Sequence, residues 1–206
     1  MNPQTLRSSQ PGPAGPIELA IDVPMGPARL RGIAVICHPH PQFGGSLDNK
    51  VVQTLARAYV QLGYRAVRFN FRGIGASAGA WDSGQGEIDD ALAVIAAQRE
   101  PGLPLALAGF SFGAFVAGQA ATRLGPDARA ERLLLVGPAV VHFAMATVPA
   151  DTVVIHGEAD EVVPLAAVFD WARPQTLPVI VVPGVGHFFH GQLPLLKSLV
   201  AGTWHC

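Results

Sequence analysis

Two short segments of the chain place a serine between two glycines in the pattern G-x-S-x-G. They are Gly109-Phe-Ser111-Phe-Gly113 and Gly75-Ala-Ser77-Ala-Gly79. In this pattern the serine can sit on a sharp turn between a strand and a helix, where its hydroxyl is exposed for nucleophilic attack. The chain has 23 glycines, so the bare pattern arises by chance in roughly one such chain in ten. The surrounding sequence must therefore decide whether either serine is a nucleophile.

The sequence around Ser111 predicts the strand, turn and helix that this pattern requires. The apolar segment LALAGF comes directly before it, and AFVAGQAATR follows. A helix that begins near Phe112 directs its first N–H groups and the positive end of its dipole toward the serine, which favours a developing oxyanion. We therefore predict that Ser111 is the nucleophile. The alternative is a tight strand-to-helix junction that happens to use serine.

Ser77 also follows an apolar strand, but its context is different. The residues after it, AWDSGQG, cannot begin a helix before about Glu87. The same segment contains a G-x-G-x-x-A pattern from Gly73, which would suggest a dinucleotide site only if it opened a helix directly. We predict a flexible loop at the carboxyl edge of the sheet, without a dinucleotide.

A serine hydroxyl is a weak nucleophile unless a neighbouring base, usually histidine, is oriented by an acid. Three acids follow the apolar strand expected at 152–156, at Glu158, Asp160 and Glu161. The carboxyl end of a strand is where ligands bind in open α/β sheets. We rank Asp160 first and Glu158 second, and a solvated loop is the alternative for all three.

The candidate base is His187, in a glycine-containing loop after the strand expected at 179–182. His190 lies further on, at the start of the last helix. Ser111, Asp160 and His187 each follow a separate parallel strand, in the chain order that accompanies this serine motif. We predict that the three form a catalytic triad.

An acyl-transfer site also needs N–H donors for the oxyanion, one of which should come from Phe112, the residue after the nucleophile. The other should come from the loop CHPHPQFGG at 37–45. Its two prolines have no N–H, which leaves His40, Gln42 or Phe43, and we favour His40. His38 and His40 could instead suggest a metal site, but no further ligand follows in this loop and a catalytic zinc needs three. We expect no metal.

Periodicity along the chain alternates short apolar strands with helices, which is typical of a mainly parallel sheet with helices on both faces. The first two strands have no helix between them, so the sheet is expected to begin antiparallel. Strands are predicted at 17–23, 33–36, 64–71, 105–110, 133–136, 152–156 and 179–182. Helices are predicted at 48–62, 88–98, 112–123, 165–172 and 192–201.

The length of 206 residues suits one domain, which we place at 17–206. Residues 1–16 are rich in Pro, Gly and Ser and are predicted to be a disordered lead-in that lacks the apolar core of a signal peptide. Only a short segment separates the strands at 133–136 and 152–156, so no large cap domain can be inserted there.

Composition excludes several partners. The net charge is −1 without a basic cluster, which argues against nucleic acid. The apolar runs are short and broken by Pro and Gly, so no membrane span is expected. The two cysteines, Cys37 and Cys206, lie far apart in the sequence and fit a reducing cytoplasm. We expect a small-molecule substrate and no cofactor.

By these segments the chain resembles the α/β-hydrolase superfamily over nearly its whole length, and within it small bacterial hydrolases or carboxylesterases without a lid. The resemblance rests on ICHPHPQFGGSLDNKVV, RFNFRGIGAS, GFSFGA, HGEADEVVP and GVGHFF. It implies that Ser111, Asp160 and His187 are the catalytic set. The chain departs from many relatives in having HPHP where they have His-Gly, and Asn70 where Asp is frequent.

The expected function is therefore hydrolysis of a small or short-acyl ester by a serine nucleophile, without a cofactor. The alternatives are a thioesterase, an amidase or an acyltransferase with the same triad, or a catalytically silent binding module on this scaffold. Without a cap, short loops must form the substrate pocket. The candidates for its walls are Phe43, Trp81, Phe110, Met145 and Phe188.

Overall fold

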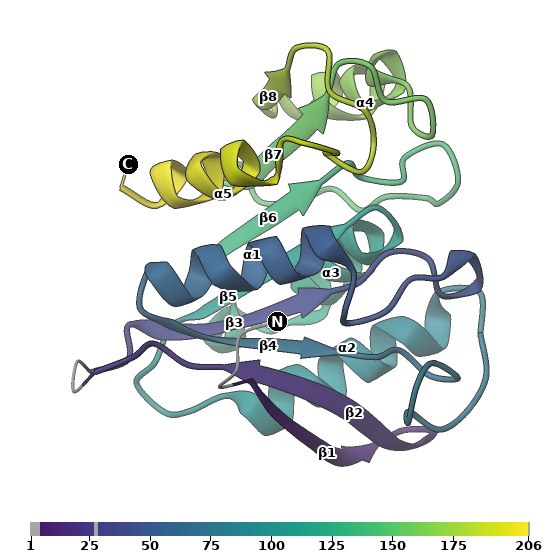
Figure 1. Ribbon diagram of the computed structural model, residues 1–206. Helices are drawn as coiled ribbons and strands as arrows, with labels where there is room; N and C mark the ends of the chain where they lie inside the picture. Colours follow the sequence, from purple (N-terminus) through teal and green to yellow (C-terminus); the bar gives the residue numbers. More distant parts are fainter. Residues whose placement is uncertain (1–4, 27–28, 206) are drawn as a thin grey trace.

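The strands form one eight-stranded sheet in the computed structural model, which describes residues 5–26 and 29–205 (Figure 1). From β4 to β8 all neighbouring strands are parallel, which confirms the expected mainly parallel sheet. In spatial order the strands are β1 (Leu6–Gly12), β2 (Gly15–Asp22), β4 (Tyr64–Phe69), β3 (Gly32–Cys37), β5 (Leu105–Phe110), β6 (Arg132–Val136), β7 (Val153–Gly157) and β8 (Val179–Val182).

The sheet begins with antiparallel strands, as expected, but the strand next to β2 is not the one that follows it in the sequence. β2 pairs antiparallel with β1 and with β4, so β4 separates β2 from β3. The prediction that 1–16 is disordered is wrong for residues 6–16, and residues 1–4 lie outside the described part. β1 pairs with β2 in register from Leu6 to Gly12, because a neighbouring strand supplies the hydrogen bonds that a Pro- and Gly-rich segment cannot make by itself.

Contacts from β1 to other parts of the chain fix it further. Gln10 is buried, and its Nε2–H donates to the carbonyl oxygen of Ala93 at 3.2 Å. Its Oε1 accepts from Gln98 at 2.9 Å. Arg7 also forms an ion pair at 2.6 Å with Asp48, which lies just before the first helix. This pair is largely exposed and contributes at most about 1 kcal/mol, so the backbone ladder does most to hold β1.

Helices cover both faces of the sheet (Figure 1). α1 (Lys50–Gln61) and α5 (Leu193–Gly202) pack on one face, and α2 (Gln85–Gln98), α3 (Phe112–Arg123) and α4 (Leu165–Ala172) on the other. Short 3₁₀ helices occur at Pro41–Phe43, Pro126–Ala128, Arg173–Gln175 and Thr203–His205. None of the helices in the described ranges is long and apolar enough to cross a membrane.

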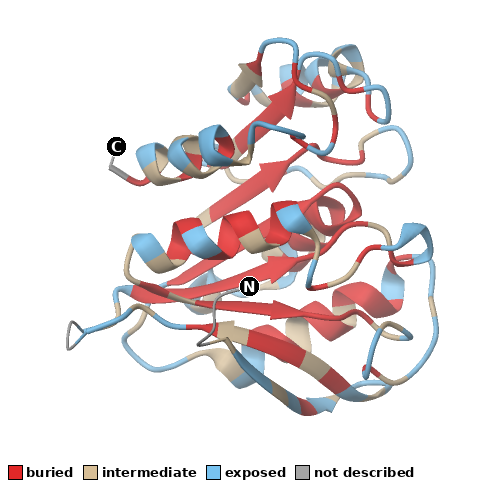
Figure 2. Ribbon diagram, in the orientation of Figure 1, coloured by how far each residue is buried: buried red, intermediate tan, exposed pale blue. Residues whose placement is uncertain are grey.

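The central strands are buried on both faces, as Figure 2 shows in red. In β3, Ile33 and Val35 pack toward α2 and α3, whereas Ala34 and Ile36 pack toward α1. This two-sided burial explains why the strand consists almost entirely of apolar residues. The rigid sheet brings the carboxyl ends of β3, β5, β7 and β8 to one edge.

The connection from β6 to β7, residues 137–152, contains no helix or strand. The fold therefore has no cap domain, as the short spacing predicts. This segment crosses the same edge of the sheet as the loops that carry the candidate catalytic residues.

Candidate active site

Ser111 occupies a single-residue turn between β5 and α3. Its backbone angles are φ 57° and ψ −118°, which are unusual for a residue with a side chain and cost of order 1–3 kcal/mol. A Cβ at Gly109 would overlap the carbonyl of Gly113, and a Cβ at Gly113 would overlap that of Cys37. Both glycines are thus required by close backbone approach. The Ser111 N–H remains in the sheet, where it donates to Val136 O at 2.9 Å.

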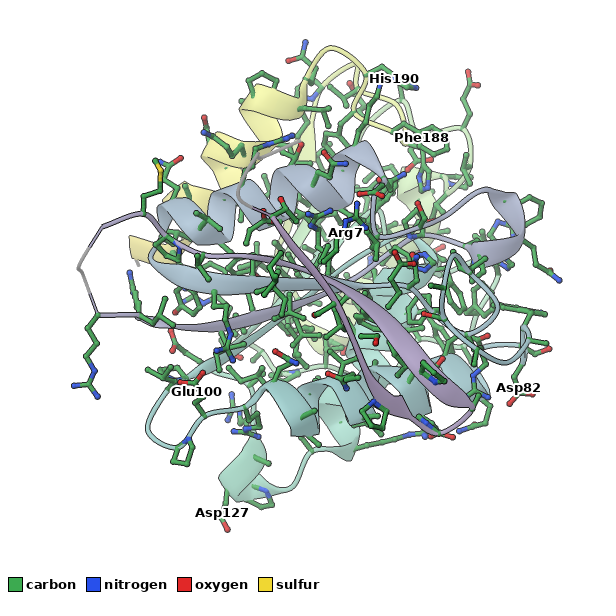
Figure 3. The ribbon with its side chains drawn as sticks, turned by 60° about the horizontal axis from the view of Figure 1, so that its bottom comes forward. Arg7, Asp82, Glu100, Asp127, Phe188 and His190 are labelled. Atoms are coloured by element: carbon green, nitrogen blue, oxygen red, sulfur yellow. The ribbon has the colours of Figure 1, made fainter. Side chains whose placement is uncertain are left out.

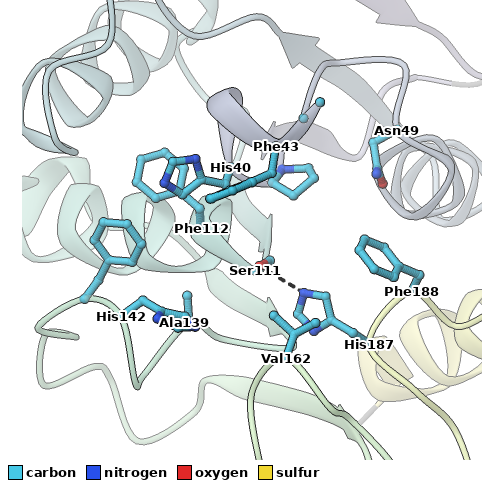
Figure 4. Close-up of a pocket in the computed structure, with 14 residues that line it drawn as sticks. His40, Phe43, Asn49, Ser111, Phe112, Ala139, His142, Val162, His187 and Phe188 are labelled. Atoms are coloured by element: carbon cyan, nitrogen blue, oxygen red, sulfur yellow. Dashed lines mark hydrogen bonds between the residues drawn. The ribbon is translucent and has the colours of Figure 1, made fainter.

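The side chains of Ser111, His187 and Asp160 form one hydrogen-bonded row. His187 Nε2 lies 3.0 Å from Ser111 Oγ (Figure 4), and His187 Nδ1 lies 2.7 Å from Asp160 Oδ2. A carboxylate only accepts hydrogen bonds, so Nδ1 carries the proton and Nε2 presents its lone pair to the serine. The ring of Phe110 packs beside the imidazole, with centroids 4.9 Å apart. The geometry is that of a nucleophile and its general base.

Asp160 is the acid that reaches His187. Its Oδ1 accepts the N–H groups of Val162 and Val163, at 2.9 and 2.8 Å. Burial works against the charged form, but the bonds from His187 and Val163 outweigh it and hold the pKa of Asp160 below its usual value. Glu158 instead accepts the N–H of Gly184, at 2.9 Å.

His156, which the sequence patterns do not single out, lies on the other side of Asp160. Its Nε2 is 2.9 Å from Val163 O and 3.5 Å from Asp160 Oδ2. The bond to a carbonyl fixes the proton on Nε2, and Nδ1 is buried without a partner among the described residues. Burial lowers the pKa of His156, so it remains a neutral donor against the turn that carries Asp160. The only feature of the sequence that could have pointed to His156 is its position four residues before Asp160.

Two residues that line the pocket around Ser111, Phe112 and His40, have backbone N–H groups without an acceptor among the described residues. Phe112 is the first residue of α3, so its N–H has no partner within the helix. In the loop after β3, Gln42 N–H donates to His40 Nδ1 at 3.2 Å and Phe43 N–H to His40 O at 3.1 Å. Within residues 29–205 no acceptor takes the N–H of His40. Of the three candidate donors in this loop, His40 alone keeps a free N–H.

His38 has a structural role that conflicts with metal binding. Its Nδ1 lies 2.6 Å from the carbonyl oxygen of Pro39 and must donate to it, and its Nε2 accepts the N–H of Phe71 at 3.1 Å. Both ring nitrogens are therefore occupied. Complete burial lowers the pKa of His38 to about 3, so the ring is neutral.

A pocket of about 490 Å³ opens above Ser111 (Figure 4). Phe43 and Phe188 lie in its wall and are 85% and 45% exposed. Residues of the wall that were not expected include Asn49, Ala139, His142, Phe143 and Val162. Three of these come from the β6–β7 connection. Its sequence has no periodicity from which to predict which side chains face the pocket.

Three of the predicted wall residues lie outside the pocket. Phe110 is fully buried in the core beneath His187, because it is the last residue of a strand that is buried on both faces. Trp81 packs behind the wall, with its ring 4.5 Å from that of His40. Met145 packs partly buried against the core on the α3 side. For these three the structure thus gives no place in the pocket wall, unlike Phe43 and Phe188.

Comparison with known proteins gives consistent matches. The profile of the family described as serine aminopeptidase S33 matches residues 29–147. An α/β serine hydrolase without a lid from Xanthomonas campestris is 38% identical, with a TM-score of 0.89, and the match covers 98% of this chain and 94% of that one. A serine hydrolase homologue from Coxiella burnetii is 37% identical, with a TM-score of 0.83 and 98% and 97% coverage.

A curated sequence match is partial. An uncharacterized protein of Rickettsia prowazekii is 37% identical over 124 residues, which are 59% of this chain. The match covers 47% of that protein, so this chain spans about half the length of the curated relative.

Proposed function

The chain belongs to the α/β-hydrolase superfamily, and from this membership we propose that it is a carboxylesterase for small or short-acyl esters. Ser111 is the nucleophile, His187 the general base and acid, and Asp160 the orienting acid. The observation that best supports this is the row of hydrogen bonds at 3.0 and 2.7 Å through His187, directly beneath an open pocket.

In the first half of the reaction, Ser111 Oγ attacks the ester carbonyl carbon while His187 Nε2 takes the serine proton. Asp160 holds the imidazole in this tautomer and stabilises its cationic form. The oxyanion of the tetrahedral intermediate lies at the N–H groups of Phe112 and His40. Such donors typically contribute about 3–4 kcal/mol each to the transition state.

The intermediate then collapses. The bond between the carbonyl carbon and the alcohol oxygen breaks, and the alcohol leaves with the proton from His187. In the second half, His187 removes a proton from water, and the hydroxide attacks the acyl-enzyme at the same carbon. The acid is released and Ser111 regains its proton, so no cofactor takes part.

We prefer an ester to the N-terminal peptide that the family's description would suggest. An aminopeptidase needs a carboxylate to bind the substrate's terminal ammonium. Among the described residues that line the pocket around Ser111 there is no Asp or Glu. A neutral acyl group therefore fits this pocket better than a charged amino-acyl group.

The same site could act on a thioester or a small amide, or could transfer the acyl group to an alcohol in place of water. A catalytically silent scaffold is the rival from another class. The free and buried Cys37 agrees with a reducing compartment, and we place the reaction in the cytoplasm.

The test has two steps. A fluorophosphonate probe should label the wild-type protein at Ser111, and Ser111→Ala should not be labelled. A panel of acetyl ester, thioester and amide substrates with the same acyl group should then give its highest kcat/KM with the ester. Wild-type protein that is neither labelled nor active would exclude the proposal in favour of a silent scaffold.

A further inference from the structure

A second cavity shares part of its wall with the active-site pocket. It has a volume of about 420 Å³ and is formed by the loops that follow β7 and β8. Val162, His187 and Phe188 line both cavities. Val162 and Phe188 are 43% and 45% exposed, so their side chains form a shared rim that is open to solvent.

The second cavity has a different chemical character from the first. Three residues with polar side chains, Glu161, His190 and Gln192, are among those that line it. His190 lies beside Phe188, with ring centroids 5.7 Å apart, as the labelled side chains in Figure 3 show. Within the described ranges none of these three polar side chains makes a hydrogen bond or ion pair. The side chain of the nearby Glu158, by contrast, accepts a hydrogen bond from the N–H of Gly184.

The direction in which an ester must bind follows from the proposed reaction. The carbonyl oxygen points to the N–H groups of Phe112 and His40. The alcohol oxygen must lie where His187 Nε2 can protonate it as it leaves. His187, Val162 and Phe188 line both cavities, so an alcohol part that extends past His187 over this shared rim reaches the second cavity. The alcohol part of the ester is thus directed to the polar cavity.

We propose that the second cavity binds the alcohol part of the substrate and that this alcohol is a polyol, rich in hydroxyl groups. The proposal rests on the proposed esterase function and names the substrate of that same site. Glu161 accepts hydrogen bonds from hydroxyl groups, and Gln192 and His190 both donate and accept them. A cationic alcohol would leave the donors of Gln192 and His190 unused. The substrate is then a short apolar acyl ester of a polyol.

The experiment compares two acetates whose alcohol parts have the same number of non-hydrogen atoms, glyceryl monoacetate and an unbranched alkyl acetate. In the wild type, kcat/KM should be about tenfold higher for the glyceryl ester, because a hydrogen bond to a charged group is available only to it. Glu161→Gln should remove most of this preference through KM. Gln192→Ala should reduce it by a smaller factor.

Asp170→Asn is the matched control, because it removes an equal charge from the exposed face of α4 and lies in neither cavity. Activity of the wild type on p-nitrophenyl acetate tests the proposed function separately, because the alcohol part of this ester is not a polyol. No activity on any ester would overturn the esterase function itself. An active enzyme without glyceryl preference, a preference that survives in Glu161→Gln, or a stronger preference for acetylcholine would overturn the polyol site alone.

Discussion

Ser111 and Ser77 stand in the middle of the same five-residue pattern and have opposite environments. Ser111 holds a backbone conformation with positive φ between β5 and α3, and its Oγ faces His187 and an open pocket. Ser77 lies in the loop after β4, where its Oγ donates to Asn70 O at 2.7 Å and accepts the N–H of Glu18 at 2.9 Å. A hydroxyl that backbone groups use on both sides has no base to activate it.

Asn70 extends the structural role of the Ser77 region. Its Oδ1 accepts the N–H of Leu47 at 2.8 Å, and its Nδ2 donates to Glu18 at 2.7 Å. Ser77, Asn70 and Glu18 thus join β2 to two loops. The two serines differ in the element that comes after their strand: a helix begins at once after Ser111, whereas a long loop separates β4 from α2.

The largest effect on activity is expected when each of the two serines is replaced in turn by alanine. Ser111→Ala should lower kcat by about a million-fold, the order of effect known for loss of a triad serine. Ser77→Ala should keep wild-type kcat and probe labelling but lower the free energy of unfolding by about 1–3 kcal/mol, because two buried partners lose a bond. Ester kinetics and urea denaturation measure the two effects. Probe labelling that persists in Ser111→Ala would reverse the assignment.

The next largest effect should distinguish two acids of the loop after β7, Asp160 and Glu158. Asp160→Asn should lower kcat by about ten-thousandfold, because an amide no longer fixes the His187 tautomer. Glu158→Gln should lower it by less than about tenfold, since Glu158 bonds only Gly184 N–H. Steady-state kinetics at one pH suffices. If Glu158→Gln were inactive and Asp160→Asn fully active, the two acids would have to be exchanged.

A third test uses His38, which accepts the N–H of Phe71 at the base of the Ser77 loop. Its pKa is lowered to about 3 in the folded state, below the ordinary value of about 6.5 for the unfolded chain. The unfolded state therefore binds the extra proton between these values. Stability is complete above about pH 6.5 and is lost on acidification, by up to about 1.4 kcal/mol per pH unit.

Urea unfolding at several pH values measures this slope in the wild type and in His38→Gln. The variant lacks the titrating ring, so its free energy of unfolding should change less between about pH 6.5 and 4. A variant with the wild-type slope would show that His38 does not carry this dependence.

The smallest expected effect is on substrate preference, and it depends on the pocket beside Ser111. Its walls end at Phe43 and Phe188, which are largely open to solvent. Each buried acyl CH₂ contributes about 0.8 kcal/mol, and only where there is a wall. With p-nitrophenyl esters, kcat/KM should peak at about two to four acyl carbons. An oil–water interface should give no jump in activity. A preference for long chains would contradict this view of the pocket.

The sequence predicted the bounds of β5, α3, α4 and β8 where local signals were strong. Gly109 and Gly113 frame the turn at Ser111, and Pro164 precedes α4. It failed for β1, because the partners of Leu6–Gly12 lie in β2 and in α2 and are set by the fold. The composition of a segment indicates whether it can form structure by itself. It does not show the hydrogen bonds that other parts of the fold provide.

The site shows the same limit. Ser111, Asp160 and His187 could be found because each follows its own strand, and parallel strands end at one edge. The wall could be predicted only in part, at Phe43 and Phe188, because the type of a residue does not tell which way its side chain points. Phe110 points into the core, whereas Phe143, in a loop without periodicity, lines the pocket.

The turn at Ser111 also has a consequence for hydrogen exchange. The amide of Ser111 belongs to the β5–β6 ladder, through Val136 O, and should exchange only with opening of the central sheet. The very next amide, of Phe112, has no partner in the helix and faces the pocket. We therefore expect the amide of Phe112 to exchange much faster than its neighbour, the amide of Ser111. We therefore expect the N–H of Phe112, the proposed oxyanion donor, to be held in place by the central sheet before any substrate arrives.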